Sequence, residues 1–243
     1  MDRYAVIHTV MPREFVLLQG QGCKWKQCTF CDYHTDVSED PFSVNREVLA
    51  YVTGIYGVLD VINSGSAIEL DGQTIKEIKR IVKEKNIHTL WFEAHYMYRH
   101  KLEKFAEQFD GVDVKFRCGI ESFDGALREL WKKGVSSDVT VEDVAKYEPL
   151  AIGFNCSYGV KNVVDNIELL TRFTTIPTYA APSAGIPDAK GRHPETAKKH
   201  TETLRTAAER GILSIVGGCC GTTAEYTRSV AQMARHYKPR KTE

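Results

Sequence analysis

The chain has 243 residues, and its 42% apolar and 26% charged content is ordinary for a soluble globular protein. Its 32 basic and 32 acidic residues balance, so no net field attracts nucleic acid or an anionic membrane. We see no signal peptide and no apolar run that would span a bilayer, and we therefore expect a cytoplasmic protein. Seven cysteines, an odd number, argue against a disulfide framework and for metal ligation.

Short apolar runs alternate with amphipathic stretches along the whole chain. The runs that we expect to be strands are 4–10, 14–20, 58–63, 88–93, 113–117, 150–155, 178–181 and 213–216. The stretches that we expect to be helices are 45–56, 74–85, 101–109, 124–133, 141–147, 163–172, 195–210 and 224–236. This alternation predicts a parallel sheet with right-handed crossovers, in an α/β fold of the TIM-like (βα) barrel type with seven or eight strands.

A loop with three cysteines follows the second expected strand. Cys23, Cys28 and Cys31 are spaced C-x4-C-x2-C. Three thiolates can hold three irons of a 4Fe–4S cube and leave the fourth iron open, whereas a zinc site would want a fourth protein ligand nearby. The loop resembles that of the radical SAM superfamily, with one residue more than the usual spacing and with Phe30 at the place of a common aromatic residue. A zinc knuckle and three unrelated thiols are the alternatives.

Two further motifs extend this resemblance over residues 1–147. The first follows the strand at 58–63 and stands where the superfamily has a glycine-rich motif that contacts the amino group of S-adenosylmethionine (SAM), although the acidic residue of that motif is missing. Its residues are Asn63, Ser64, Gly65 and Ser66. The second, 116–122, resembles the strand that lines the SAM ribose and carboxylate, and its candidate residues are Arg117, Gly119 and Glu121.

The resemblance implies roles for these side chains. Arg117 would pair with the SAM carboxylate, and Glu121 would accept hydrogen bonds from the ribose hydroxyls. A structural ion pair at a strand end is the alternative for both residues. The resemblance also implies a small-molecule substrate, unidentified, and a one-electron donor such as flavodoxin or ferredoxin.

The second half of the chain has a different resemblance. The expected strand ends at 152–159, 181–187 and 216–223 look like successive motifs of the homocysteine S-methyltransferase family. In that family the residues that match Cys156, Cys219 and Cys220 bind Zn²⁺ and leave the fourth position to a substrate thiol such as homocysteine. Zinc lowers the pKa of such a thiol, so that it attacks as the thiolate. A buried cysteine pair in a glycine-rich turn is the alternative.

Taken together, these resemblances suggest one barrel domain over residues 1–243, assembled from two half-barrels, 1–147 and 148–243. Such a chain is a natural or engineered chimera. Three functions remain open on this basis. They are a radical SAM protein with a 4Fe–4S cluster and SAM, a zinc-dependent homocysteine S-methyltransferase, and a non-catalytic scaffold, since fold does not imply function.

Overall fold

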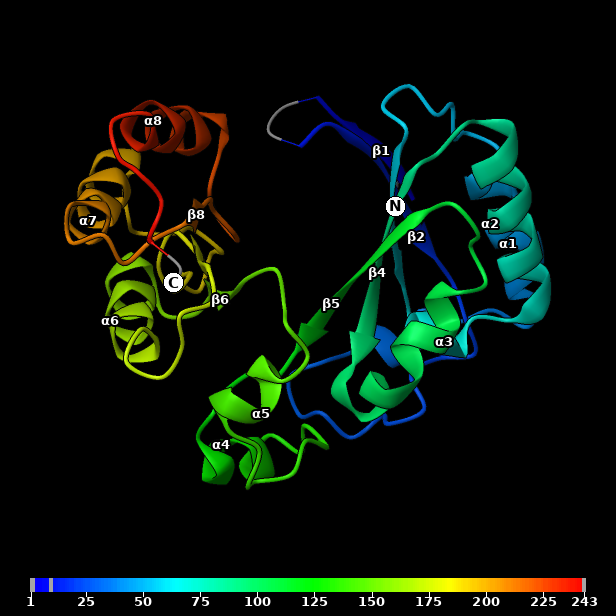
Figure 1. The fold of residues 1–243 in the computed structure, drawn as a ribbon, viewed down its shortest axis with the longest axis horizontal. Coiled ribbons are helices and arrows are strands. Elements are labelled where there is room, and N and C mark those ends of the chain that lie inside the picture. Colours follow the sequence, from blue (N-terminus) through cyan, green and yellow to red (C-terminus); the bar gives the residue numbers. More distant parts are fainter. Residues whose placement is uncertain (1–2, 9–10, 242–243) are drawn as a thin grey trace. The chain divides into compact units, whose positions relative to one another are not determined.

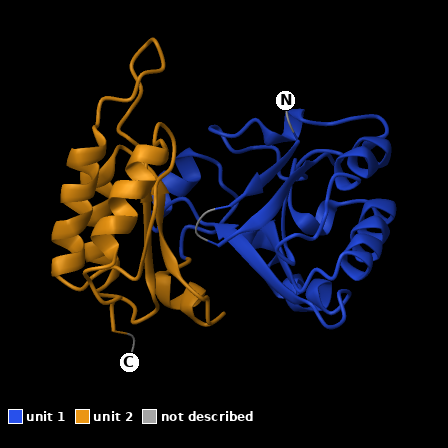
Figure 2. Cartoon of the chain, turned by 90° about the horizontal axis from the view of Figure 1, so that it is seen from above, with its two compact units in different colours: residues 1–138 blue, residues 139–243 orange. Residues whose placement is uncertain are grey.

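The computed structural model describes residues 3–8 and 11–241. The chain forms two compact units, Met1–Asp138 and Val139–Glu243, and each is described by itself (Figure 2). The boundary expected from sequence, at 147/148, lies nine residues after this division. A single domain over residues 1–243 remains a prediction.

The first unit is built on a five-stranded sheet with the order β1-β2-β3-β4-β5 (Figure 1). Its strands are β1 (Tyr4–Ile7), β2 (Arg13–Leu18), β3 (Val58–Asn63), β4 (Thr89–His95) and β5 (Asp113–Gly119). The strands β2 to β5 pair in parallel, as the sequence predicts. The first strand pairs antiparallel with β2, because the five residues between them are too few for a parallel crossover. Val10, the last residue of the expected strand, lies outside the described residues.

One face of this sheet carries the core of the unit. Residues Leu18, Leu59 and Phe92 are fully buried there against α1 (Pro41–Leu49), α2 (Gly72–Glu84) and α3 (Leu102–Ala106). Figure 1 shows α1 and α2 side by side along this face. The amphipathic helix expected over 74–85 is confirmed, since Ile75, Ile78, Ile81 and Val82 of α2 are all buried.

Capping residues explain where these helices begin. The carboxylate of Asp71 accepts hydrogen bonds from the second and third amides of α2, which removes two of its unsatisfied donors. The Asp40 carboxylate accepts from one amide of α1, that of Ser43, and Pro41 stands at the first position, so α1 begins four residues before the expected 45 and ends at Leu49. Asp124 caps α4 (Gly125–Leu130), which begins where the helix expected over 124–133 does and ends three residues earlier. Three short 3-10 helices complete the unit: η1 (Tyr33–Thr35), η2 (Ala67–Glu69) and η3 (Tyr96–Lys101).

The second unit has a three-stranded parallel sheet with the order β6-β7-β8. Its strands are β6 (Ile152–Cys156), β7 (Thr178–Pro182) and β8 (Ile215–Val216). The helices are α5 (Val141–Ala145), α6 (Val160–Leu170), α7 (Ala197–Glu209) and α8 (Ala224–Ala234). The middle helix of the last three, α7, packs against both α6 and α8 (Figure 1).

The strands thus pair in two sheets rather than one. In the described ranges, 3–8 and 11–241, no pairing joins β5 to β6, and the closed barrel that we expected is not shown. What holds is an α/β fold with mostly parallel sheets. No helix within these ranges is both long and apolar enough to cross a bilayer.

Candidate functional site

The three-cysteine loop follows β2 in the first unit. Cys23, Cys28 and Cys31 are all free thiols of intermediate exposure. The amide of Cys31 donates to the carbonyl of Cys28 at 3.3 Å, which closes a turn between these two ligand candidates. Burial raises the pKa of Cys28, the ammonium of Lys133 opposes this, and the thiolates of Cys31 and Cys23 raise it further. The three thiols are therefore close enough to influence one another.

Their spacing differs from that of a single-ion site. Among the residues that the structure describes, one cysteine trio has all three sulfurs within 4.8 Å of one another. This trio is not the loop at 23–31 but the second set, Cys156, Cys219 and Cys220. Thiolates on three different irons of a cube stand farther apart than thiolates around one ion. The donor set of Cys23, Cys28 and Cys31 thus fits a cluster better than a zinc knuckle.

The cysteine loop rests on the segment 131–134, which sequence reasoning did not single out. The amide of Thr29 donates to the carbonyl of Trp131 at 3.0 Å, and Nε1 of Trp25 donates to the carbonyl of Lys132 at 2.6 Å. The Trp25 ring lies directly on Gly134, where an added Cβ would come within 2.4 Å of it. These contacts join residues more than 100 positions apart in the sequence, so no local sequence pattern predicts them.

Lys133 is the cation of this region. Its ammonium lies 2.7 Å from the Glu121 carboxylate and 5.8 Å from the centre of the Phe30 ring. The residue is only 8% exposed, so its charge acts at reduced solvent screening. Its carbonyl is 2.7 Å from Nε2 of His95, and the His95 ring stacks on Trp25 with 6.1 Å between ring centres. Lys133 thus faces the cysteine loop from the segment that carries it.

The motif 63–66 lies beside the cysteine loop. The Ser64 hydroxyl accepts a hydrogen bond from the amide of Gly20 at 2.8 Å, just before that loop. Gly65 packs on the backbone of Cys23, since an added Cβ would lie 3.1 Å from its Cα. The Ser66 hydroxyl accepts from the amide of His95 at 2.8 Å, at the end of β4. The motif therefore joins the ends of three neighbouring strands.

Two further features bear on a ligand at this motif. The Oδ1 atom of Asn63 is buried and has no hydrogen-bond partner, so an acceptor is left open at the end of β3. The carboxylate of Glu69 accepts from the amides of Ser66 at 3.1 Å and Lys24 at 3.3 Å, and from the Tyr98 hydroxyl at 2.7 Å. A carboxylate is thus present at the motif after all. The capping-box spacing from Ser66 to Glu69 was the signal that would have found it.

The charged residues of the second predicted SAM motif, Arg117 and Glu121, are engaged in ion pairs. Arg117 forms two hydrogen bonds with Asp60, at 3.1 and 2.5 Å, and Glu121 pairs with Lys133. These are the structural ion pairs that the sequence left open as the alternative. Gly119 pairs with His95 across β4 and β5 and lies beside the Lys133 ammonium. Their assignment to SAM remains a prediction.

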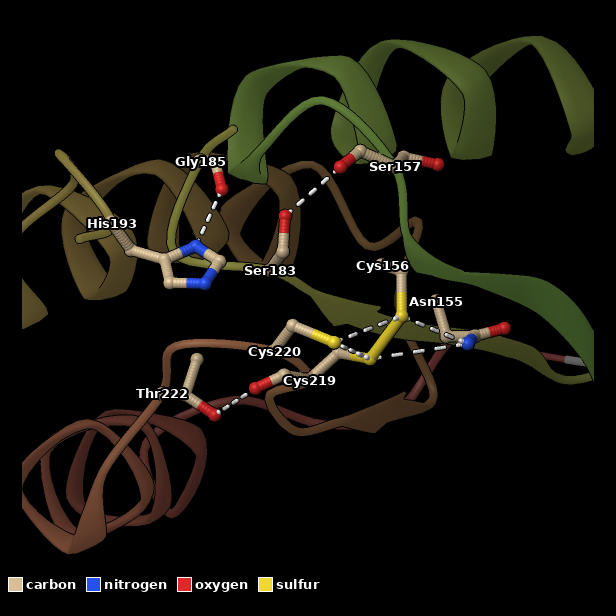
Figure 3. Close-up of a disulfide and its surroundings, with 9 residues drawn as sticks. All are labelled: Asn155, Cys156, Ser157, Ser183, Gly185, His193, Cys219, Cys220 and Thr222. Carbon is tan, nitrogen blue, oxygen red and sulfur yellow. Dashed lines mark hydrogen bonds between the residues drawn. A yellow bond between two sulfur atoms is a disulfide. The ribbon is translucent and has the colours of Figure 1, made fainter. Parts of the chain in front are cut away.

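The second cysteine set, in the second unit, comes together at the ends of β6 and β8 (Figure 3). Hydrogen bonds between the loops that follow the strands draw it together: the Ser183 amide donates to the Cys156 carbonyl at 3.0 Å, and the Cys219 amide to the Pro182 carbonyl at 2.9 Å. Cys220 Sγ lies 3.9 Å from the sulfurs of both Cys156 and Cys219. Two thiolates on one tetrahedral zinc stand about 3.8 Å apart, given zinc–sulfur bonds of about 2.3 Å.

One pair in this set is oxidised. Cys156 and Cys219 form a disulfide, and Asn155 Nδ2 lies 3.4 Å from the Cys156 sulfur. One such pair is not a disulfide framework of the kind that the odd number of cysteines argues against. The same loop geometry that would gather three ligands around one ion also brings these two thiols within bonding distance. Zinc would need this bond to be reduced.

Comparisons with known proteins find likenesses to both a methyltransferase family and a SAM-binding lyase. The homocysteine S-methyltransferase family matches residues 97–234, which is 138 of 243 residues. A solved structure, "queuine lyase from Clostridium spiroforme bound to SAM and queuine", is 33% identical, covers 75% of this chain and 80% of its own, and has a TM-score of 0.63. The methyltransferase match begins 50 residues before residue 147, so this likeness is not confined to residues 148–243, and a chimera remains a hypothesis. The chain belongs to the homocysteine S-methyltransferase family through residues 97–234, and to the family of the queuine lyase over most of its length.

Proposed function

We propose that this protein is a radical SAM lyase that acts on a base of the queuine type. The observation that carries the proposal is the 33% identity, over most of both chains, to a lyase bound to SAM and queuine. The three-cysteine loop supports the same reading, because its thiols suit a cluster with one open iron. The methyltransferase match alone would not account for this loop, which lies before residue 97.

The residues that would hold the cofactors lie on adjoining loops. Cys23, Cys28 and Cys31 would hold a 4Fe–4S cluster, and the motif at 63–66 would receive the amino group of SAM. A bound cluster, reduced by a donor such as flavodoxin or ferredoxin, would supply the one-electron reduction that cleaves SAM to methionine and a 5′-deoxyadenosyl radical.

The chain's own side chains would position and shield this site. Trp25 and Phe30 flank the cysteines and contact the segment 131–134, which would hold the loop in position. Lys133 offsets negative charge from thiolates near it, and Glu121 holds its ammonium in place. The carboxylate of Glu69 fixes the Lys24 amide relative to Ser66.

The test is cluster and SAM binding in anaerobically reconstituted protein. We expect four irons and four sulfides per chain, and saturable SAM binding that Cys28→Ser abolishes. Cys118→Ser is the matched control, since Cys118 is a free cysteine outside both sets, and it should retain both. Absence of iron from the wild-type protein, or equal iron in Cys28→Ser, contradicts the proposal.

A second candidate is zinc-dependent thiol methylation, favoured by the sulfur spacing around Cys220 and by the family match over residues 97–234. Cys156, Cys219 and Cys220 would hold the zinc and leave one position to a thiol such as homocysteine. The methyl donor is open. After reduction, one zinc per chain that is lost in Cys220→Ser supports this candidate. If neither iron nor zinc binds, the chain is a scaffold.

A further inference from the structure

The first unit offers a second chemical surface, on the sheet face opposite the core. Successive residues of a strand point to opposite faces of the sheet. In β4, Leu90 and Phe92 are buried on the core side, so the residues that alternate with them point to the opposite face. Trp91 and Glu93 lie on that second face, and the register pairs Glu93 with Arg117 of β5 and Trp91 with Asp60 of β3. Two carboxylates, an indole and a guanidinium therefore meet on three neighbouring strands.

The two carboxylates have unequal partners. Asp60 is 2% exposed and receives two hydrogen bonds from Arg117 and one from Arg13 Nε at 2.9 Å. Glu93 has one long contact, 3.5 Å from its Oε1 to Arg117 Nε. Burial raises the pKa of Glu93, and the Arg117 charge opposes this. Asp60 accepts the hydrogen bonds from both terminal nitrogens of the Arg117 guanidinium. The carboxylate oxygens of Glu93 can therefore still accept hydrogen bonds from two donors of a ligand.

The Trp91 indole borders open space at the amino ends of the strands. Trp91 lines a cavity of about 440 Å³ together with residues at the amino ends of β2 to β5. The Arg117 guanidinium lies 5.8 Å from the Trp91 ring centre. Toward the other end of β4, two residues after Glu93, His95 stacks on Trp25 of the cysteine loop. Trp91, Glu93 and His95, at alternate positions of β4, thus run from this cavity toward the candidate cluster loop.

Queuine is a 7-deazaguanine, and its pyrimidine ring presents an N1–H and a 2-amino group side by side. A carboxylate accepts both of these hydrogen bonds at once, and enzymes that act on single bases combine such edge contacts with aromatic stacking. We propose that Glu93 reads the N1–H and 2-amino edge of a guanine-type base, with Trp91 as the stacking surface. This inference rests on the proposed function, since it names the residue that selects its substrate.

The test measures the affinity of the reconstituted, SAM-loaded protein for three bases by anaerobic calorimetry: queuine, 7-deazaguanine and 7-deazaadenine. Wild type should bind the first two and discriminate against 7-deazaadenine, which has an acceptor at N1. Glu93→Gln should lose about 10- to 100-fold in queuine affinity, the loss expected for one bidentate base contact. It should also narrow the gap between the two deazapurines, because an amide can donate to N1. A merely structural role would not change base preference.

Controls separate the possible failures. Glu103→Gln, an exposed carboxylate on α3, should bind all three bases as wild type does. Glu93→Asp keeps the charge, and it should retain the preference for guanine-type bases at reduced affinity. Glu93→Gln with unchanged SAM affinity and unchanged base preference overturns the inference and leaves the proposed function standing. Wild-type protein that binds SAM but no queuine overturns both.

Discussion

Arg117 and Asp60 form a two-pronged ion pair across the parallel strands β3 to β5, with hydrogen bonds of 3.1 and 2.5 Å. Asp60 is 2% exposed, and Arg13 adds a third hydrogen bond to it. The pair fixes the position of the guanidinium, and thereby which carboxylate on this face remains free for a ligand. The same ion pair therefore stabilises the sheet and leaves Glu93 as the carboxylate for a ligand.

Removing this carboxylate should destabilise the first unit. Asp60→Asn leaves Arg117 and Arg13 without their counter-charge, and we expect a loss of about 2 kcal/mol, below the 3–5 kcal/mol typical of a fully buried pair because Arg117 is partly exposed. Urea unfolding measures it. Asp113→Asn removes an exposed partner of Lys115 on the same sheet and should cost less than about 0.5 kcal/mol. Equal losses in the two variants would contradict the assigned role of Asp60.

A methyl group at position 65 should disturb the cysteine loop. The Cβ of Gly65→Ala would meet the Glu69 carboxylate at 2.3 Å and the Cys23 Cα at 3.1 Å, and backbone cannot give way as a flexible side chain does. We expect weaker SAM binding and a stability loss of about 1–3 kcal/mol, typical of overpacking. Gly72→Ala, at the first position of α2, meets nothing within 4 Å and should leave SAM affinity unchanged. Unchanged SAM affinity in Gly65→Ala would show that the two loops are not coupled.

Loss of the Lys133 charge should make the cluster harder to reduce. Reduction adds negative charge to the cluster, and a nearby ammonium stabilises the reduced form. Lys133→Met should therefore shift the reduction potential to more negative values, measured by redox titration with electron paramagnetic resonance. Its neighbour Lys132, which is exposed, provides the control Lys132→Met. The same potential in both variants would exclude Lys133 as the counter-charge of the site.

The second unit should lose stability in mild acid because of His200. This side chain is fully buried on α7 against the Tyr226 ring, and burial lowers its pKa below the ordinary value. The unfolded chain takes up a proton near pH 6.5, before the folded chain does. The stability is thus fully present above about pH 6.5 and falls as the pH drops from there toward the folded pKa.

Thermal unfolding between pH 5 and 8 measures this dependence. His200→Leu removes the titrating group and should flatten the pH dependence relative to wild type. His236→Asn, at an exposed histidine, should retain the wild-type slope. A slope in His200→Leu equal to that of wild type would assign the acid sensitivity to other groups.

Sequence periodicity predicted the parts of the fold that local chemistry determines. The buried stripe of α2 and the cap at Asp124 follow from residue spacing alone. The direction of β1 was missed because hydrophobic pattern does not distinguish antiparallel from parallel strands, although the short connection to β2 gave the clue. The closed barrel was expected from the number of strand–helix units, and that number does not determine which strands pair.

Some residues of the candidate site could likewise be predicted from the sequence, and others could not. The resemblance to homocysteine S-methyltransferases implied that Cys156, Cys219 and Cys220 form one set, and their sulfurs do lie within 4.8 Å of one another. Lys133 could not be found, because it reaches the cysteine loop from a turn more than 100 residues away. The sequence also could not show that Arg117 bonds more closely to Asp60 than to Glu93, because this depends on side-chain geometry across three strands.

The most direct test of the account is turnover of queuine by the reconstituted protein under reducing, anaerobic conditions with SAM. Mass spectrometry of one time course would follow both queuine and 5′-deoxyadenosine. The account predicts that queuine is consumed, that 5′-deoxyadenosine forms in step with it, and that both stop in Cys28→Ser but continue in Cys118→Ser. A wild-type protein that carries four irons and binds SAM yet leaves queuine intact would contradict it.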